Sequence, residues 1–209
     1  MTTDEIDIIE RTSPFRGYFR LDRYLLKHGL FKGGWSDTIS REILERGHAI
    51  GLLPYDPDLD KLVLIEQFRT GAYAARTSPI IDNNASPWLI ECVAGIIEEG
   101  EQPEDVVRRE AIEECGCPVS DLLPIHTYYA SPGCSSETVA LYCGRIDASN
   151  AGGIFGLDHE NEDIRVFTVS PDEAFDMMAK GQCNNSMALI ALQWFCINRD
   201  EVRRKWLSG

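Results

Sequence analysis

The first third of the chain is a series of short apolar and polar runs bounded by turn residues. Such runs, rich in Ile, Leu, Tyr and Phe, are typical of β-strands. The sequence DPDLD, at residues 56–60, predicts a turn between the last two runs. We therefore expect a β-rich N-terminal part, with strands near residues 6–12, 17–27, 38–47, 48–55 and 61–69.

Residues 70–87 are rich in Ala, Ser, Asn and Pro, which predicts a loop, and the apolar run WLIECVAG after them predicts a strand. A helix is then expected from about Gln102. Pro103 suits its first turn, acidic residues follow at its positive end, and Gly116 suits the position just past its C-terminus. On a 3.6-residue wheel, Val107, Ala111 and Cys115 form a buried stripe with three glutamates along its border.

The remainder predicts three more strands, at residues 122–130, 138–146 and 164–170. The loops SPGCSSE and GGIFGLDHENED separate them, and two helices are expected at residues 171–181 and about 185–206. Strands flanked by a few helices predict an α/β (α+β) fold in which a mixed β-sheet lies between helical layers.

Composition and charge narrow the functional classes. The 209 residues are 44% hydrophobic and 26% charged, which is ordinary globular composition. A formal net charge of −14 argues against a nucleic-acid partner, because such binding depends on Lys and Arg contacts to phosphate. No apolar run is long enough for a membrane span and the acidic N-terminus does not resemble a signal peptide, so we expect a cytoplasmic protein.

Seven scattered cysteines without a Cys-x-x-Cys pair predict buried free thiols, and the four histidines lack zinc-ligand spacing.

The helix at residues 102–115 carries the most unusual chemistry. Glu110 and Glu114 are an i, i+4 pair of like charge, which weakens a helix, and no lysine lies between them. Arg109 can neutralise Glu113, but the other two glutamates require another cation.

The spacing around this helix is specific. Gly95 is followed after five residues by Glu101, and after seven more by the run REAIEECGC that begins at Arg109. This pattern resembles the signature of the Nudix hydrolases, a loop-helix-loop that binds Mg²⁺ and cleaves nucleoside diphosphates linked to another moiety. A solvated acidic helix would explain a Glu-Glu pair but not both glycines, the arginine and Glu101 at these intervals. The departures are Ala111 and Cys117, where bulkier aliphatic residues are usual.

Further segments, FRGYF, REILERGH, IEQFR, SPG and ENEDIRV, resemble the bacterial ADP-ribose pyrophosphatase branch over nearly the whole chain, apart from a longer loop between Arg69 and Trp88. The resemblance implies a homodimer in which residues 1–46 form a β-rich dimerisation domain and residues 47–209 a Nudix α/β/α sandwich. It also implies hydrolysis of ADP-ribose to AMP and ribose 5-phosphate with Mg²⁺, or with Mn²⁺ as a substitute.

Site residues follow from the same resemblance. The metal ligands are expected to be Glu110, Glu114 and Glu113 with the Ala94 carbonyl, while Arg109 and Glu101 orient them. The base that positions the water is expected on the loop DHENED, where Glu160 aligns with the family's base and Glu162 is the alternative or an extra ligand. The expected substrate-binding residues are Tyr18, Arg41, Arg69, Pro132 and Glu137, while Arg46 is an alternative structural ion pair within EILERG.

Two other functions fit the same signature. The signature activates a pyrophosphate without recognising its substituents, so another nucleoside diphosphate sugar is the main rival substrate. A non-catalytic module that senses ADP-ribose is a second alternative. Such a module would be expected to have lost metal carboxylates, and this sequence retains all of them.

Overall fold

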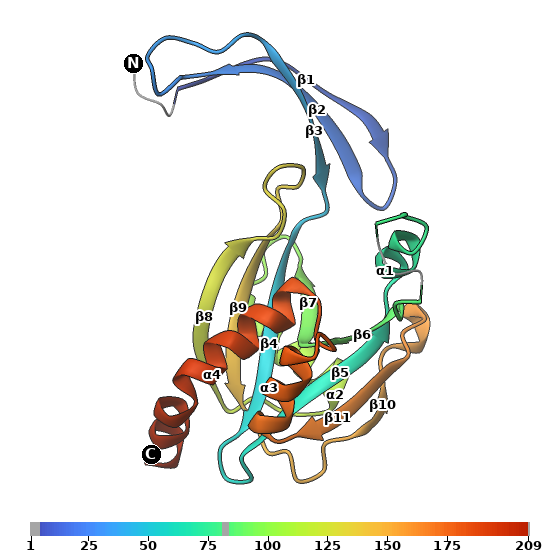
Figure 1. Ribbon diagram of the computed structural model, residues 1–209, viewed down its shortest axis with the longest axis vertical. Helices are drawn as coiled ribbons and strands as arrows, with labels where there is room; N and C mark the ends of the chain where they lie inside the picture. Colours follow the sequence, from blue (N-terminus) through green and yellow to red (C-terminus); the bar gives the residue numbers. More distant parts are fainter. Residues whose placement is uncertain (1–4, 81–83, 209) are drawn as a thin grey trace. The chain divides into compact units, whose positions relative to one another are not determined.

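The computed structural model describes residues 5–80 and 84–208, which form two compact units (Figure 1). The first unit contains the N-terminal strands as far as His48 together with residues 128–139. The second contains residues 49–127 and 140–209. In the described residues, no helix is long and apolar enough to cross a membrane.

The first unit is a three-stranded antiparallel sheet in the order β1-β2-β3. Its strands are β1 (Ile6–Arg16), β2 (Arg20–His28) and β3 (Ile39–Glu45). The loop at residues 131–137 attaches to the edge strand β3. The Leu44 N–H donates to the Cys134 carbonyl at 2.8 Å, and Ser135 Oγ donates to the Leu44 carbonyl at 3.1 Å. This loop thus covers part of the edge of β3 and provides partners for backbone groups of the strand that a neighbouring strand would otherwise have to pair.

The second unit contains an eight-stranded sheet with the strand order β10-β11-β5-β4-β9-β8, in which β6 also pairs with β5 and β7 with β4. This mixed sheet with helices, together with the small N-terminal antiparallel sheet, confirms the predicted α/β (α+β) fold class. The strands are β4 (His48–Asp56), β5 (Lys61–Phe68), β6 (Trp88–Glu91), β7 (Val93–Ile97), β8 (Asp121–Tyr129), β9 (Thr138–Arg145), β10 (Gly153–Phe155) and β11 (Ile164–Val169).

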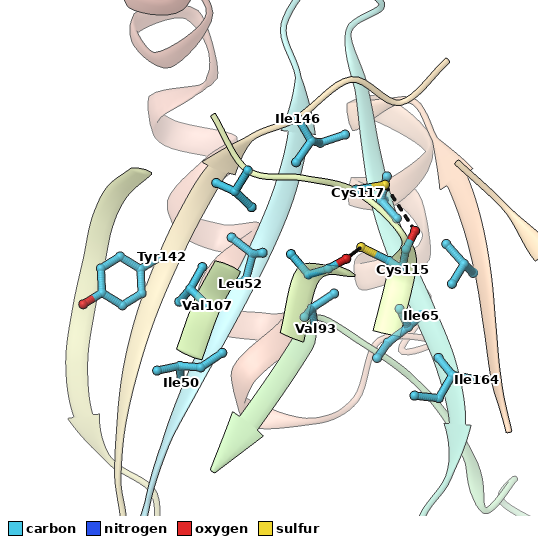
Figure 2. Packing of buried hydrophobic residues seen from close by; sticks show 14 of the residues in the cluster. Ile50, Leu52, Ile65, Val93, Val107, Cys115, Cys117, Tyr142, Ile146 and Ile164 are labelled. Atoms are coloured by element: carbon cyan, nitrogen blue, oxygen red, sulfur yellow. Dashed lines mark hydrogen bonds between the residues drawn. The ribbon is translucent and has the colours of Figure 1, made fainter. Parts of the chain in front are cut away.

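Helices cover both faces of this sheet. Figure 1 shows α3 (Pro171–Ala179) and α4 (Ser186–Leu207) in front of the central strands and α2 (Pro103–Cys115) behind them. Because strand side chains alternate between faces, Ile50 and Leu52 of β4 join the core cluster of α2, which Figure 2 shows. Tyr55 lies on the opposite face against Phe195 of α4, with ring centroids 4.7 Å apart. Strand β4 is therefore buried on both faces.

Three local predictions were wrong. The expected loop at residues 70–87 begins with a short helix, α1 (Thr70–Ala75), and part of it, residues 81–83, lies outside the described residues. The loop GGIFGLDHENED contains β10 and a 3₁₀ turn at Asp158–Glu160. The single expected strand WLIECVAG is divided at Cys92 into β6, which pairs with β5, and β7, which pairs with β4. Pairing partners distant in sequence determine such divisions, so local composition does not indicate them.

Candidate functional site

Helix α2 begins and ends as its sequence predicts. Pro103 occupies the first turn, and Glu104 and Asp105 lie at the positive end of the helix. Gly116 ends the helix in a left-handed conformation with φ of +67°, which favours glycine. The N–H of Gly116 donates to the Ile112 carbonyl, so the last turn is capped by its own backbone.

Glu114 is buried, contrary to its predicted position on the border of the apolar stripe. Only 4% of the residue is exposed, and its Oε2 accepts a hydrogen bond of 2.9 Å from the Ala94 N–H of β7. Burial raises the pKa of Glu114 to about 8, and the neighbouring charges of Glu110 and Glu162 add to this effect. An ionised Glu114 at this position therefore needs a nearby positive charge.

Glu110 lies directly against the backbone of β7. A Cβ built on Gly95 would be 2.1 Å from Glu110 Oε1, so only glycine allows this approach. Burial raises the pKa of Glu110 to about 7 although Arg109 opposes the shift. The signature glycine and glutamate, fifteen residues apart in sequence, are therefore brought together beside the Ala94–Gly95 backbone.

Arg109 orients the outer carboxylates of the helix. Its Nη1 donates to Glu110 Oε1 at 2.8 Å and to Glu113 Oε2 at 3.1 Å. Its Nη2 lies 3.7 Å from Glu101 Oε2, which in turn accepts a hydrogen bond from the Glu98 N–H at 2.9 Å. These contacts support the predicted orienting roles of Arg109 and Glu101.

The two loop glutamates differ in their surroundings. Glu162 Oε2 accepts a hydrogen bond of 3.1 Å from the Leu157 N–H, and the charge of Glu162 contributes to the raised pKa values of Glu110 and Glu114. Glu160 is exposed, with His159 Nε2 3.6 Å from its Oε1. In this conformation of the loop, Glu162 is therefore the carboxylate that faces the helix.

Arg69 has a partner that the sequence analysis missed. Its Nε and Nη2 donate to Oε2 of the buried Glu91 at 3.0 and 2.7 Å, and Gln67 approaches the same oxygen at 3.4 Å. Burial, the largest single contribution, lowers the pKa of Arg69, but the hydrogen bond to Glu91 and the charges of Glu91, Glu114 and Glu162 raise it overall. Arg69 therefore belongs to the carboxylate cluster. The only sequence signal for Glu91 was an acidic residue in the middle of the expected apolar strand WLIECVAG.

The other predicted substrate-binding residues belong to the first unit. Tyr18 is 87% exposed and stacks edge-on against Phe19 at 4.9 Å, while Arg41 and Pro132 are exposed. Glu137 is buried and forms an ion pair of 2.8 Å with Arg46 Nη1. Arg46 is therefore in an ion pair. Its partner lies in the loop 131–137, whereas the prediction placed the partner within the EILERG segment.

The donor groups fit a hard divalent cation. No three His, Cys, Asp or Glu side chains within residues 5–80 and 84–208 converge as a complete metal site. Two carboxylates, the buried Glu114 and the half-buried Glu110, nevertheless lie beside the Ala94–Gly95 backbone with raised pKa values. Mg²⁺ prefers oxygen ligands and usually keeps several waters, so it requires few protein ligands.

Comparison with known proteins agrees with this geometry. The NUDIX domain family matches residues 45–186. The ADP-ribose pyrophosphatase of Escherichia coli K12 is 46% identical over 203 residues, covering 97% of this chain and 93% of the relative. That of Haemophilus influenzae is 40% identical over 202 residues, covering 97% and 91%. A GDP-mannose pyrophosphatase of Pectobacterium atrosepticum is 31% identical over 191 residues, covering 90% and 92%.

A solved structure described as an ADP compounds hydrolase has the same fold. It superposes with a TM-score of 0.67 at 17% identity, covering all of this chain and 97% of the other. The family match spans more than half of the chain and includes β7, α2 and the loop that carries Glu160 and Glu162. The chain therefore belongs to the NUDIX family and is a Nudix hydrolase.

Proposed function

We propose that this enzyme hydrolyses the pyrophosphate of ADP-ribose to AMP and ribose 5-phosphate in a Mg²⁺-dependent reaction, with Mn²⁺ as a substitute. The observation that carries the proposal is a pair of carboxylates, the buried Glu114 and the half-buried Glu110, beside the Ala94–Gly95 backbone. The two relatives at 40–46% identity, which are ADP-ribose pyrophosphatases, support the choice of substrate.

The carbonyl of Ala94 and the carboxylates of Glu110, Glu113 and Glu114 would hold the metal. Bound Mg²⁺ polarises pyrophosphate oxygens, lowers the pKa of water and stabilises developing negative charge. Arg109 keeps Glu110 and Glu113 in place, with hydrogen bonds of 2.8 and 3.1 Å. The raised pKa values of Glu110 and Glu114 support this assignment, because their ionised forms need a cation nearby.

A loop glutamate supplies the general base. We assign this role to Glu160 and the role of an additional ligand to Glu162, whose charge already acts on Glu110 and Glu114. The exposed position of Glu160 requires the loop to close before its carboxylate accepts the proton of the attacking water. Gly156, at the start of this loop, has a φ of +105° that favours glycine and can act as a hinge.

Substrate recognition uses residues of two subunits, because a second subunit of a homodimer supplies Tyr18, Arg41 and Glu137. Arg69 binds phosphate or ribose oxygens through its planar guanidinium group. Tyr18 stacks on the adenine, Arg41 and Pro132 contact the substrate, and Glu137 approaches it from the partner subunit. The exposed apolar side chains of β1, including Ile6 at 65% and Phe15 at 59%, support a dimer, because burial against a second copy would remove them from water.

All seven cysteines are free thiols, which supports a cytoplasmic location.

A second substrate class has specific support. The GDP-mannose pyrophosphatase relative covers 90% of the chain at 31% identity, so another nucleoside diphosphate sugar is the main alternative. A non-catalytic sensor of ADP-ribose is less favoured, because Glu110, Glu113 and Glu114 are all retained.

A substrate panel tests the proposal. Full-length enzyme is incubated with Mg²⁺ and ADP-ribose, ADP-glucose, GDP-mannose, FAD, NADH or a diadenosine polyphosphate, and nucleotide release is quantified. We expect the highest kcat/KM for ADP-ribose, with AMP and ribose 5-phosphate as products, and loss of turnover with a chelator. Preference for GDP-mannose would establish the alternative. Binding of ADP-ribose without turnover would establish the sensor.

A further inference from the structure

Strand β10 lies at one edge of the sheet of the second unit (Figure 1), and its last residue, Phe155, directly precedes the loop of the catalytic glutamates. Phe155 pairs with Ile164 of β11, which is fully buried in the core cluster of α2. Side chains of paired residues lie on the same face of a sheet, so the half-buried Phe155 ring packs toward α2. The proposed chemistry itself does not use this side chain.

The ring of Phe155 lies against the C-terminal end of α2. A Cβ built on Gly116 would be 2.6 Å from Cε1 and 2.9 Å from Cζ of this ring, so the ring covers the glycine backbone. Gly116 has a φ of +67°, and the same glycine therefore both ends the helix and leaves room for the ring. Phe155 is thus in contact with the end of the helix that carries the proposed metal ligands.

The backbone after Phe155 connects this contact to a loop glutamate. The Gly156 N–H donates to the Glu113 carbonyl at 3.4 Å, which joins the start of the loop to α2. A Cβ built on Gly156 would be 2.6 Å from Glu162 Cβ, so only glycine allows this approach. The Leu157 N–H donates to Glu162 Oε2 at 3.1 Å, and the Glu162 N–H donates to the Leu157 carbonyl at 3.3 Å. Two residues of backbone therefore separate the ring from the group that holds the Glu162 carboxylate.

Glu160 has different contacts. Its N–H donates to the Leu157 carbonyl at 2.9 Å, while its carboxylate lies on the exposed 3₁₀ turn, 3.6 Å from His159 Nε2. The contacts with α2 therefore act on the start of the loop and on Glu162, and the turn that carries Glu160 lies beyond them.

We propose that Phe155 is a positioning residue for Glu162. Its ring fixes the start of the loop against Gly116, so that the Glu162 carboxylate is held toward the proposed metal ligands of α2. The inference rests on the proposed function, in which Glu162 is an additional ligand. The ring acts by packing and not by charge, so an aliphatic side chain of similar reach should replace it in part.

The experiment compares Phe155→Ala and Phe155→Leu in full-length enzyme, with Ile154→Ala as the matched control. Ile154 is the preceding residue of β10 and is 67% exposed, so its truncation alters the same strand on the opposite face. Calorimetry measures the binding of Mg²⁺ alone, and hydrogen exchange measures the protection of residues 156–163 in metal-free protein. Turnover of ADP-ribose is the third measurement.

We expect Phe155→Ala to weaken Mg²⁺ binding by about tenfold, the lower end of the usual cost of losing a group that orients a metal ligand. Exchange protection of the loop should fall, and kcat should drop by at least about tenfold, because a displacement of about 1 Å can cost about 10²-fold. Phe155→Leu should restore most of each loss, and Ile154→Ala should behave as the wild type.

A double-mutant cycle separates positioning from a general effect on packing. If Phe155 acts through Glu162, Phe155→Ala should cost little further Mg²⁺ affinity in a Glu162→Gln background. Losses that add in full would overturn the inference, as would unchanged Mg²⁺ binding and exchange in folded Phe155→Ala. If Phe155→Ala does not fold, Phe155→Val, which suits a strand but is too short to cover Gly116, takes its place in the same cycle.

Failure of the proposed function gives a different result. A wild-type enzyme that hydrolyses none of the substrates in the panel would overturn that function. The Mg²⁺ and exchange measurements would then still judge the role of Phe155, because neither requires turnover.

Discussion

Each unit buries a carboxylate, but the two have different surroundings. In the first unit, Asp22 is fully buried and accepts hydrogen bonds from Ser13 Oγ at 2.6 Å and Arg20 Nε at 2.9 Å, as well as from Arg11. The bonds from Ser13 and Arg11 hold its pKa well below the usual range. In the second unit, Glu114 accepts a bond from the Ala94 N–H, and burial raises its pKa to about 8.

Apolar groups show the opposite contrast. The second unit covers its sheet with α2 on one face and with α3 and α4 on the other, so Ile50, Leu52 and Tyr55 are fully buried. The first unit contains no helix among its described residues, and Ile6 and Ile8 of β1 are more than half exposed. The first unit therefore has a buried carboxylate in ion pairs and an uncovered apolar surface, whereas the second has a covered core and, in Glu114, a buried carboxylate without an ion pair among the described residues. This difference is consistent with the proposed second subunit for the first unit and the proposed cation for the second.

Removing the charge of Glu114 should weaken the binding of the proposed cation in the second unit. We expect Glu114→Gln to lower kcat by on the order of 10³-fold, the upper range for loss of one group that stabilises transition-state charge. Stability without Mg²⁺ should rise slightly, because a buried charge and a repulsion from Glu110 at i, i+4 disappear. Glu99→Gln, at an exposed position shortly before helix α2, is the matched control. Wild-type turnover in folded Glu114→Gln would exclude the metal-ligand assignment.

The loop glutamates test whether charge in the second unit acts in catalysis or only in metal binding. We expect Glu160→Gln to lower kcat by at least about 10²-fold with little change in substrate affinity, because a general base acts in the transition state. The loss should narrow as pH rises, since hydroxide can partly replace the base. Glu162→Gln should cost less turnover and should weaken Mg²⁺ binding more. If Glu162→Gln is the more damaging to kcat, the two roles are exchanged.

Lysine substitutions on strand β1 test whether a second subunit covers the exposed apolar side chains of the first unit. Full burial of one isoleucine contributes about 1.5–3 kcal/mol, so the double variant Ile6→Lys/Ile8→Lys should raise the dimer dissociation constant by about 10²-fold or more. Sedimentation equilibrium measures this constant, and kcat/KM should fall with it. Asp7→Lys introduces the same side chain between the two positions and serves as the control. A variant that sediments as the wild type would exclude β1 from the interface.

The sequence predicts helix α2 well because its signals are local. Pro103, the acidic first turn and Gly116 act within one or two turns of the chain, and the structure has the helix at Pro103–Cys115. The close approach of Gly95 and Glu110 is a tertiary contact that the sequence analysis did not state, although it expected the Ala94 carbonyl and Glu110 in one metal site.

Other features depend on contacts that no local pattern contains. The helical wheel placed Glu114 on a border, but β7 packs over it, so the residue is buried. The partner of Arg69 is Glu91 on β6, which β-sheet pairing brings opposite β5. Helix α1 was missed because a segment rich in Ala, Ser, Asn and Pro resembles a loop in composition. In each case, residues distant in sequence determine the outcome.

The smallest expected effect concerns the paired charge of the first unit. Because the pKa of Asp22 is lowered in the folded protein, its ionised form stabilises the fold above the unfolded pKa of about 3.9, and this stabilisation is lost as pH falls toward the folded pKa. The difference in unfolding free energy between the wild type and Asp22→Asn should therefore be constant from about pH 5 to 8 and shrink below about pH 4. Urea unfolding at each pH measures it, with Asp7→Asn as an exposed control on the same sheet. A difference that stays constant into strong acid would mean that the hydrogen bonds of Asp22 do not depend on its charge, and the contrast with Glu114 would then be one of packing alone.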